Sequence, residues 1–442
     1  MTTRGVALGL VILATIAIAG TAVARPPQNV PATSAMYDVS AAEPVSTYTL
    51  PPDLYRKARN LGRISFVMRL TSAPYQWLAF VLLILWKIPV MYRECAEKLS
   101  RRNFLQVLIY AALFVLTLAI LLLPIDLFEH HLSRSYGLSV QGWGSWGWDF
   151  AKSELISIAA ATIGMWMLFG LIRRSPRHWW FYFWLISLPI GISLVFLQPL
   201  VVDPLFHKFV PLAEKDPGLA TSLRDMAQHA GENIPTQQMF WMDAGAKTTE
   251  LNAYVTGIGA SKRIVVWDTT IAKMTTPEVV FVAGHEMGHY VLLHIPKQLA
   301  WEAVALFLYF YLGFHCADWT LRRFGERWRI RGADDLAALP VIVLPLIVLS
   351  FVASPIESAV SRYYEHQADQ YGLEITHGLT PDSKQDAARA FQILGEVDLA
   401  DPAPSRADVF LFYSHPTIAD RIRFALSYDP WRNGESGEFV KQ

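Results

Sequence analysis

The segment Thr275–His294, TTPEVVFVAGHEMGHYVLLH, decides the interpretation of this chain. It predicts one helix, because Thr275 or Thr276 can cap its start and Pro277 suits its first turn. Pro296 follows closely and is expected to end the helix, since proline cannot donate the backbone hydrogen bond that a helix interior needs.

Inside this segment lies an HExxH motif formed by His285, Glu286 and His289. Residues four apart lie one above the other on a helix, so both imidazoles can bind one Zn²⁺. Glu286 is turned by about 100° from the first histidine, which directs its carboxylate to a metal-bound water. Small residues around the pair are expected to leave room for metal and substrate: Ala283, Gly284 and Gly288. The alternative is a chance match on an ordinary core helix.

The composition indicates a membrane protein. Of the 442 residues, 53% are hydrophobic and only 17% are charged, which is more apolar than an ordinary soluble enzyme. The 38 basic and 38 acidic residues balance, so no nucleic-acid partner is expected. The two cysteines, Cys95 and Cys316, have no metal-ligand spacing. Any metal must therefore be held by histidine and carboxylate.

The N-terminus predicts export or membrane insertion. Residues 1–24 contain one arginine, an apolar run and Ala22-Val23-Ala24, an A-x-A cleavage pattern. They form either a signal peptide or a first membrane helix. Residues 25–74 are polar and rich in proline, and we predict an extramembrane, largely irregular segment that ends in a short helix.

Further segments are apolar and long enough to cross a bilayer. They are Tyr75–Tyr92, Phe104–Pro124, Ile156–Ile172, Trp179–Leu200, Leu299–Ala317 and Leu336–Ser354. Together with a first membrane helix they predict a mostly α-helical, polytopic membrane protein with about seven transmembrane helices. Buried helices of a large soluble protein are the alternative, but Trp and Tyr cluster at several segment ends, as in a membrane interface.

Two stretches, residues 201–296 and 358–442, are not membrane-like. In the first, three segments alternate like short strands: Gln237–Met242, Leu251–Gly257 and Arg263–Thr269. We predict a small antiparallel sheet just before the HExxH helix. The intervening residues 75–200 and 297–357 hold the predicted spans.

A catalytic zinc site needs a third protein ligand. His294 is the nearest candidate in sequence, but five residues after the motif it points off the ligand face. The segment Ser361–Asp369, SRYYEHQAD, places Glu365 and Asp369 on one helix face, where the aspartate can accept the free N–H of a ligand histidine. Spacing alone does not decide between Glu365 and His366 as the ligand, and an exposed charged helix is the alternative.

These motifs resemble the type I CaaX prenyl proteases, a family of membrane-integral zinc metallopeptidases. The resemblance rests on HEMGH, on SRYYEHQAD and on FYSHPTIADRI at Phe412–Ile422. It also includes DPLFHKFVPL at Asp203–Leu212 and LNAYVTGIGASKRIVVWDT at Leu251–Thr269. It covers the chain from about Tyr75 to Phe424.

The resemblance implies a gluzincin-type protease in which seven helices enclose a water-filled chamber. His285, His289 and Glu365 would bind one Zn²⁺, which favours Glu365 over His366 as the third ligand. Glu286 would be the general base.

The resemblance implies three further roles. Asp369 would be the acid that supports a ligand histidine. His415, in Ser414-His415-Pro416, would stabilise the oxyanion. Asn252, Ala253 and Tyr254 would belong to an edge strand that pairs with the substrate backbone.

The function predicted from these residues is zinc-dependent hydrolysis of peptide bonds by a membrane-embedded endopeptidase. Its partners would be a peptide or protein substrate, lipidated or membrane-associated, and membrane lipid. The alternative is a polytopic receptor or transporter with a non-catalytic metal site, in which the intramembrane residues Glu302 and His315 would mark a pathway.

Loop charge predicts the orientation. Three short basic loops, Arg93–Arg102, Arg173–His178 and 322–331, fall on one side of the predicted spans, and the positive-inside rule makes that side cytoplasmic. With the export-like N-terminus, this predicts a bacterial inner-membrane protein whose catalytic part faces the periplasm. The basic stretch Arg56–Arg69 argues against this orientation. So does the cytosolic catalytic side of the eukaryotic enzymes that the chain resembles.

Overall fold

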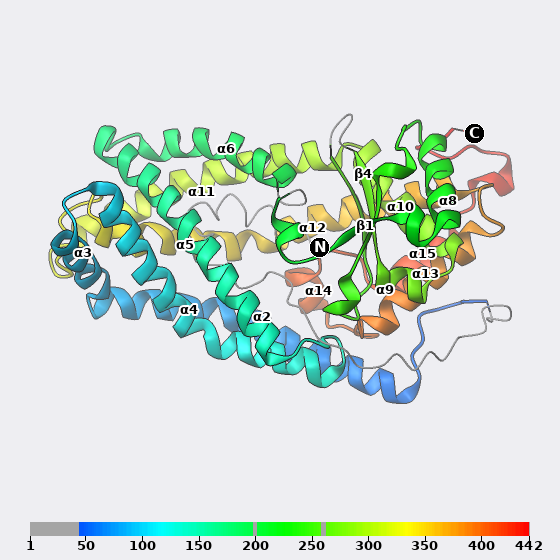
Figure 1. Cartoon of the computed structure of the whole chain (residues 1–442), viewed down its shortest axis with the longest axis horizontal. Coiled ribbons are helices and arrows are strands. Elements are labelled where there is room, and N and C mark those ends of the chain that lie inside the picture. Colours follow the sequence, from blue (N-terminus) through cyan, green and yellow to red (C-terminus); the bar gives the residue numbers. More distant parts are fainter. Residues whose placement is uncertain (1–43, 198–200, 258–261, 442) are drawn as a thin grey trace.

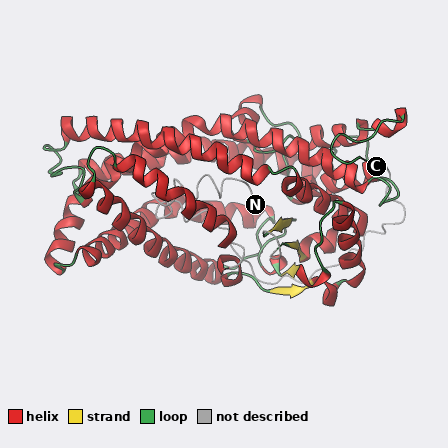
Figure 2. Ribbon diagram, turned by 90° about the horizontal axis from the view of Figure 1, so that it is seen from above, coloured by secondary structure: helices red, strands yellow, loops and turns green. Residues whose placement is uncertain are grey.

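The computed structural model describes residues 44–197, 201–257 and 262–441 (Figure 1). Long helices run along most of the elongated molecule, and a small sheet with shorter helices forms one end (Figures 1 and 2). The predicted signal peptide or first membrane helix, residues 1–24, lies outside the described residues.

The long helices carry the predicted spans. They are α2 (Pro52–Leu85), α3 (Ile88–Leu99), α4 (Asn103–Tyr136), α5 (Trp143–Arg174), α6 (Trp179–Leu197), α11 (His294–Phe324) and α12 (Leu339–Thr376). Among the described residues, five helices are long and apolar enough to cross a membrane: α2, α4, α5, α11 and the helical stretch ending with α12. α6 adds a shorter apolar helix. The prediction of a mostly helical membrane protein is confirmed.

The first predicted span is wrong at its C-terminal end. α2 stops at Leu85, and Lys87 adopts a left-handed backbone conformation with a φ of 59°. Pro89 then lies in the first turn of α3, where its missing N–H costs nothing. The apolar run of Tyr75–Tyr92 is therefore divided between two helices.

The helix predicted at the end of residues 25–74 is present, but it is not short: α2 begins at Pro52 and continues for 34 residues into the first predicted span. Its basic N-terminal half is held by acidic partners from the far end of the chain. Arg59 pairs with Asp401 at 2.8 Å, and Arg69 pairs with Asp408 at 2.8 Å. The partners of each ion pair are more than 300 residues apart in the sequence, so no local sequence pattern predicts them.

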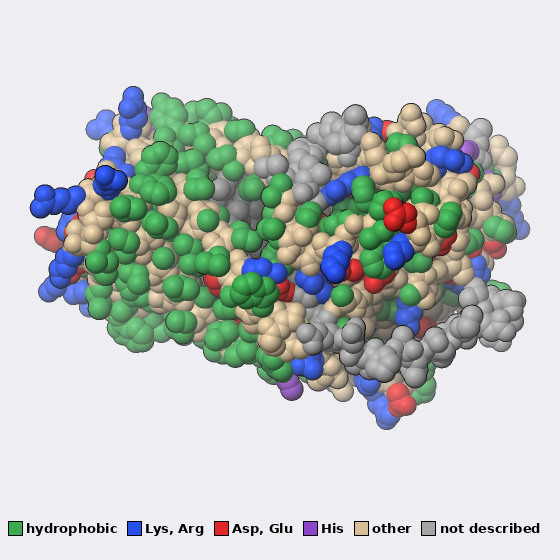
Figure 3. Space-filling view, viewed as in Figure 1, with side chains coloured by type: hydrophobic (Ala, Val, Ile, Leu, Met, Phe, Trp, Pro, Cys, Tyr) green, Lys and Arg blue, Asp and Glu red, His purple; other side chains and the backbone are tan. Residues whose placement is uncertain are grey.

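The molecule has two main hydrophobic cores. One fills the helical bundle around Tyr110, Phe114 and Phe169, and the other lies between the sheet and the helices that cover it, around Phe281 and Phe391. The surface differs accordingly: the bundle is covered with hydrophobic side chains, whereas charged side chains mark the other half and the outer end of the bundle (Figure 3). This distribution fits a bundle surrounded by lipid.

The sheet has four strands: β1 (Phe209–Pro211), β2 (Met239–Met242), β3 (Ala253–Thr256) and β4 (Arg263–Trp267). Their order is β1-β2-β4-β3. The three predicted strands are present in shortened form, and β1 was not predicted. The sheet is mixed rather than antiparallel as predicted, since β2 and β4 are parallel while the other pairs are antiparallel. β3 forms the edge of the sheet next to β4. β4 therefore lies between β3 and β2, and it runs parallel to β2.

The HExxH helix, α10 (Thr276–Val291), is shorter than predicted. Thr275 and Glu278 form a capping box at its start. It ends at Val291, and Leu293 turns the chain with a φ of 56°. Pro296 therefore does not end this helix but lies in the first turn of α11.

α12 joins the two halves of the molecule. Its 38 residues form a helix about 57 Å long, which exceeds the thickness of a bilayer core. It starts within the bundle and ends against α10 (Figure 1). It crosses the predicted boundary between residues 357 and 358 without a break.

Shorter helices complete the sheet-containing half of the molecule. They are α7 (Leu212–Lys215), α8 (Pro217–His229), α9 (Asp268–Lys273), α13 (Ser383–Val397), α14 (Arg406–Phe412) and α15 (Ile418–Ser427).

Candidate metal centre

Close packing of α10 against α12 creates the candidate site. A side chain on Gly284 would place its Cβ 2.8 Å from Ile375, and one on Gly288 would lie 3.0 Å from Tyr371. A Cβ on Gly372 of α12 would lie 3.1 Å from the backbone nitrogen of His285 in α10. These glycines therefore allow the two helices to touch. The prediction that Gly284 and Gly288 leave room for metal and substrate is wrong.

His285 and His289 of α10 and Glu365 of α12 converge at this contact. The two Nε2 atoms lie 3.2 Å apart. Glu365 Oε2 is 3.3 Å from His285 Nε2, and Glu365 Oε1 is 3.6 Å from His289 Nε2. Tetrahedral zinc with bonds of about 2.0–2.2 Å needs ligand atoms about 3.3–3.5 Å apart. Among the described residues, this is the one group of at least three metal-binding side chains close enough to share an ion.

The charges around His285 suit a cation. Its Nδ1 lies 2.8 Å from Asp369 Oδ1. Burial opposes a charge on the imidazole, but hydrogen bonds to Asp369 and Glu365 outweigh burial and raise the pKa of His285 to about 10. Glu365 Oε2 is buried and faces His285 Nε2 at 3.3 Å. The site therefore stabilises positive charge at His285 Nε2, where a divalent cation would replace a proton.

His289 is held as a neutral ligand would be. Its burial lowers the pKa of the imidazole to about 3, so the ring is uncharged near neutral pH. A neutral imidazole and a carboxylate beside a second imidazole form the donor set of a catalytic zinc site. The residues present therefore fit the metal that the motif predicts.

Asp369 is fixed by Arg421 of α15, a residue that sequence analysis missed. Arg421 donates to both carboxylate oxygens of Asp369, at 2.9 Å from Nε and 2.5 Å from Nη2. Asp369 is therefore a charged acceptor for a hydrogen bond from the Nδ1–H of His285. Arg421 lies in the FYSHPTIADRI segment on which the family resemblance rests, and this place in the motif could have marked it as a site residue.

Glu286 follows His285 on α10, and His415 lies beside Glu365. Glu286 is partly buried, and this burial raises the pKa of its carboxyl above the ordinary value. His415 Nε2 is 3.2 Å from Glu365 Oε2, and its side chain is 40% exposed. Ser414 contacts the other ring nitrogen of His415 at 3.0 Å. Burial lowers the pKa of His415, which favours a neutral ring.

Asn252, Ala253 and Tyr254 lie at and next to the outer strand β3, which packs beside α10. Trp267 N–H donates to Asn252 C=O at 3.1 Å, so this is a hydrogen-bonded pair. Such pairs alternate along an antiparallel ladder, so Ala253 and Val255 direct their backbone groups to the open edge. Tyr254 instead directs its hydroxyl to Asp203, at 3.4 Å.

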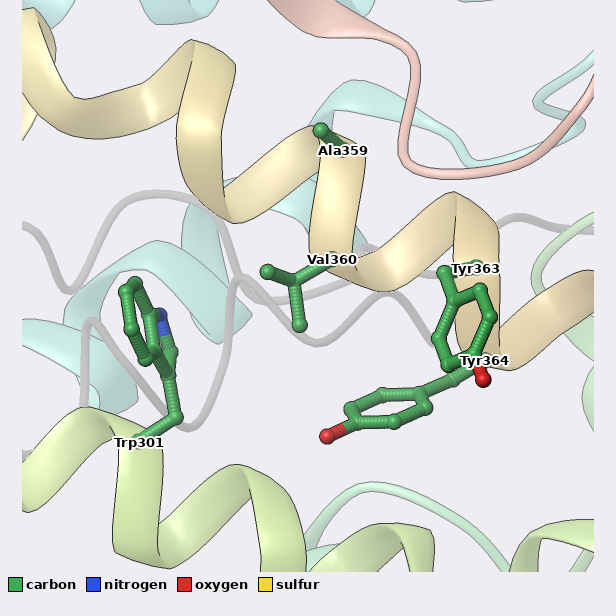
Figure 4. A pocket seen from close by; sticks show the side chains of 5 residues that line it. All are labelled: Trp301, Ala359, Val360, Tyr363 and Tyr364. Carbon is green, nitrogen blue, oxygen red and sulfur yellow. The ribbon is translucent and has the colours of Figure 1, made fainter.

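A cavity of about 400 Å³ lies between α11 and α12. Figure 4 shows its lining residues: Trp301, Ala359, Val360, Tyr363 and Tyr364. Tyr364 precedes Glu365 in sequence, and its ring stacks on His294 with 4.6 Å between centroids. Tyr364 therefore lines the cavity and also contacts His294.

Comparison with known proteins identifies the family of the chain. Residues 213–429 match Peptidase family M48, and residues 39–208 match the family described as CAAX prenyl protease N-terminal, five membrane helices. Uncharacterized metalloprotease YhfN of Bacillus subtilis is 34% identical over 87% of this chain and 88% of its own. CAAX prenyl protease 1 of Saccharomyces cerevisiae is 26% identical, over 69% of this chain and 68% of its own.

The fold has a solved relative. The crystal structure of S. mikatae Ste24p superposes with a TM-score of 0.73 at 24% identity, covering 86% of this chain and 89% of that one. The resemblance expected from the motifs is thereby confirmed. These matches leave the receptor or transporter alternative without support. The chain belongs to peptidase family M48 and is an integral membrane metalloprotease.

Proposed function

We propose that the protein is a zinc-dependent endopeptidase, with His285, His289 and Glu365 as the zinc ligands. The convergence of these side chains at ligand-to-ligand distances of 3.2 to 3.6 Å carries the proposal. A set of three ligands leaves a fourth position for water or substrate. Bound zinc would supply an activated water and polarise the scissile carbonyl.

The residues around the metal then divide the work of peptide hydrolysis. Glu286 accepts a proton from the attacking water and passes it to the leaving amine. A carboxylate whose pKa is raised by burial suits the first half of this exchange, because it is a stronger base toward the attacking water than an ordinary glutamate is. Asp369, held by Arg421, keeps the ring of His285 in its ligand orientation.

The substrate is proposed to bind as an added strand. Ala253 and Val255 offer backbone donors and acceptors at the open edge of β3, so an extended peptide can pair there. Asn252 and Tyr254 are the neighbours of Ala253 in the chain. Main-chain pairing requires an extended peptide and little sequence specificity.

The substrate class follows from the relatives and the membrane. Several relatives bear the name CAAX prenyl protease 1, and we extend this to a peptide or protein substrate that is lipidated or otherwise associated with the membrane. The metal site lies on a helix that continues into the apolar bundle, so a membrane-anchored substrate can approach along it. Membrane lipid is the other expected partner.

Metal removal tests the proposal directly. Purified protein in detergent is expected to cleave a test peptide, to lose this activity with a zinc chelator, and to regain it when one equivalent of Zn²⁺ is restored. Peptide products are measured by mass spectrometry. Cleavage that persists unchanged in a protein shown to be free of metal would refute a zinc mechanism.

His415 provides a second test. Its replacement by Ala is expected to lower kcat by about a hundredfold, the usual effect of losing one donor to the oxyanion. Zinc content should not change, because the proposed ligands are intact. Loss of zinc in this variant would instead identify His415 as a metal-binding residue.

We place the protein in a bacterial inner membrane with the catalytic part on the periplasmic side. The three basic loops lie at the outer end of the bundle, far from the sheet (Figures 1 and 3). The opposing basic stretch of α2 is partly neutralised, since Arg59 and Arg69 pair with Asp401 and Asp408. The relative in Bacillus subtilis supports the proposed bacterial source, though not the orientation.

Cysteine labelling tests this orientation. In a background without Cys95 and Cys316, a cysteine at Ser436 is expected to react with a membrane-impermeant thiol reagent on intact cells. A cysteine at Ser175, in the loop between α5 and α6, is expected to react only after the cells are opened. The reverse pattern would place the catalytic side in the cytoplasm.

A further inference from the structure

We infer that His294 is a positioning residue that fixes the tautomer and orientation of His289. The inference rests on the proposed metal site and adds a member to it. His294 is 2% exposed, and its Nδ1 lies 3.1 Å from Nδ1 of His289. It touches the ring nitrogen of His289 that faces away from the metal-binding group.

The other contacts of His294 determine which nitrogen carries its proton. Its Nε2 lies 3.2 Å from Gln367 Oε1, a hydrogen-bond acceptor. Gln367 presents this oxygen because its amide nitrogen donates to the Tyr363 hydroxyl at 3.3 Å. The proton of a neutral His294 therefore resides on Nε2, and its Nδ1 carries a lone pair.

That lone pair accepts a hydrogen bond from the Nδ1–H of His289. The opposite nitrogen, His289 Nε2, is then left with its own lone pair directed at His285 Nε2 and Glu365. A ligand histidine normally gives its other N–H to a carboxylate, carbonyl or water, which orients the ring. Here a buried histidine fills that place, while Asp369 does so for His285.

Packing holds the His294 ring in place. Tyr364 stacks on it at 4.6 Å and an interplanar angle of 22°. Tyr364 and Gln367 flank Glu365 on α12, so a single helix turn supplies a proposed ligand and the partners that orient His294. A shift of this turn would disturb both sides of the site together.

A turn of the backbone makes this contact available. On a continuous helix His294 would point off the ligand face, as spacing predicts. The left-handed Leu293 ends α10 and returns the chain, so that His294 starts α11 and lies against His289. His294 is therefore close to the site without belonging to the predicted ligand set.

The test measures zinc affinity, by competition with a chelator, in full-length protein carrying Glu286→Gln so that turnover plays no part. His294→Phe keeps the ring that stacks on Tyr364 but removes the acceptor. It is expected to weaken zinc binding by about 10- to 100-fold, the usual effect of losing a partner of a ligand histidine. His294→Asn restores an acceptor near the Nδ1 position and is expected to recover most of the affinity.

His366→Phe is the matched control, because His366 is exposed, follows Glu365 directly and packs on Phe424 at 4.3 Å. It should bind zinc as the parent does. Thermal unfolding of the metal-free proteins identifies a merely structural effect, which would lower stability equally in the Phe and Asn variants without separating their zinc affinities. The Co²⁺ absorption spectrum of each variant reports the geometry of the site.

Three results would overturn the inference. His294→Phe could bind zinc as tightly as the parent, or His294→Asn could be as weak as His294→Phe. Alternatively, His294→Phe could lose all zinc while Glu365→Gln retains it, which would make His294 a ligand. A parent protein that binds no zinc would instead refute the proposed metal site, before any variant is compared.

Discussion

Glu286→Gln is expected to abolish proteolysis while the protein keeps its fold and its zinc. The amide has nearly the same size as the carboxyl, but it cannot accept the proton of the attacking water. Loss of a general base typically costs 10²- to 10⁴-fold, and we expect the upper end, about 10⁴-fold, because the two other carboxylates at the site, Glu365 and Asp369, are already engaged with the histidines. Peptide cleavage, zinc content and thermal unfolding are measured on the same preparation.

The pattern across the three measurements matters more than the loss of activity alone. Zinc content at one ion per chain and an unchanged unfolding midpoint would assign the loss to chemistry. An active Glu286→Gln protein would contradict the assigned base. It would reopen the interpretation of HExxH as a binding motif without turnover.

Glu365→Ala is expected to leave the protein without tightly bound zinc and therefore without detectable proteolysis. The change removes one of three ligands and the negative charge that faces both imidazoles. Metal analysis after dialysis against a weak chelator measures the effect. His366→Ala is the control, since its exposed side chain lies one position further along the same helix.

The control also tests the alternative that the sequence left open. If His366→Ala lost zinc and Glu365→Ala retained it, the third ligand would be the histidine. In the structure His366 packs on Phe424, away from the group formed by Glu365 and the two histidines. Retention of zinc by both variants would require a different third ligand.

The parts of the site that the sequence predicted are those with a local spacing. His285 and His289 lie four residues apart on one helix, so their common face follows from helix geometry alone. Glu365 lies on another helix, and spacing could not separate it from His366. The resemblance to a family made that choice, and packing explains it: Gly284, Gly288 and Gly372 allow α10 and α12 to touch on the side where Glu365 points.

The residues that sequence analysis missed depend on long-range contacts or on a single backbone angle. Arg421 reaches Asp369 from a helix 52 residues further along the chain. His294 reaches His289 because Leu293 adopts a left-handed conformation, and no glycine or asparagine in the sequence indicates a turn at that point. Strand β1 has only three residues and includes Pro211, too short and too atypical for a periodic pattern.

The same limit applies to α2. Only a short helix was expected before residue 75, after a proline-rich, irregular segment. Two arginines of its basic N-terminal half find carboxylates near the C-terminal end of the chain, and these pairs hold the extended helix against the protease half. A prediction from local composition has no access to such partners.

The unbroken course of α12 means that this protease has no detachable soluble module. The helix rises about 39 Å between Leu339 and Glu365, so the third proposed ligand lies just beyond the reach of the hydrocarbon core. A fragment that kept the whole helix would carry its apolar half into water. A fragment cut within it would lose the turns that hold Glu365 in register with α10. The helical bundle and the sheet-containing half therefore depend on the same helix. We expect either half alone to aggregate or to bind metal poorly.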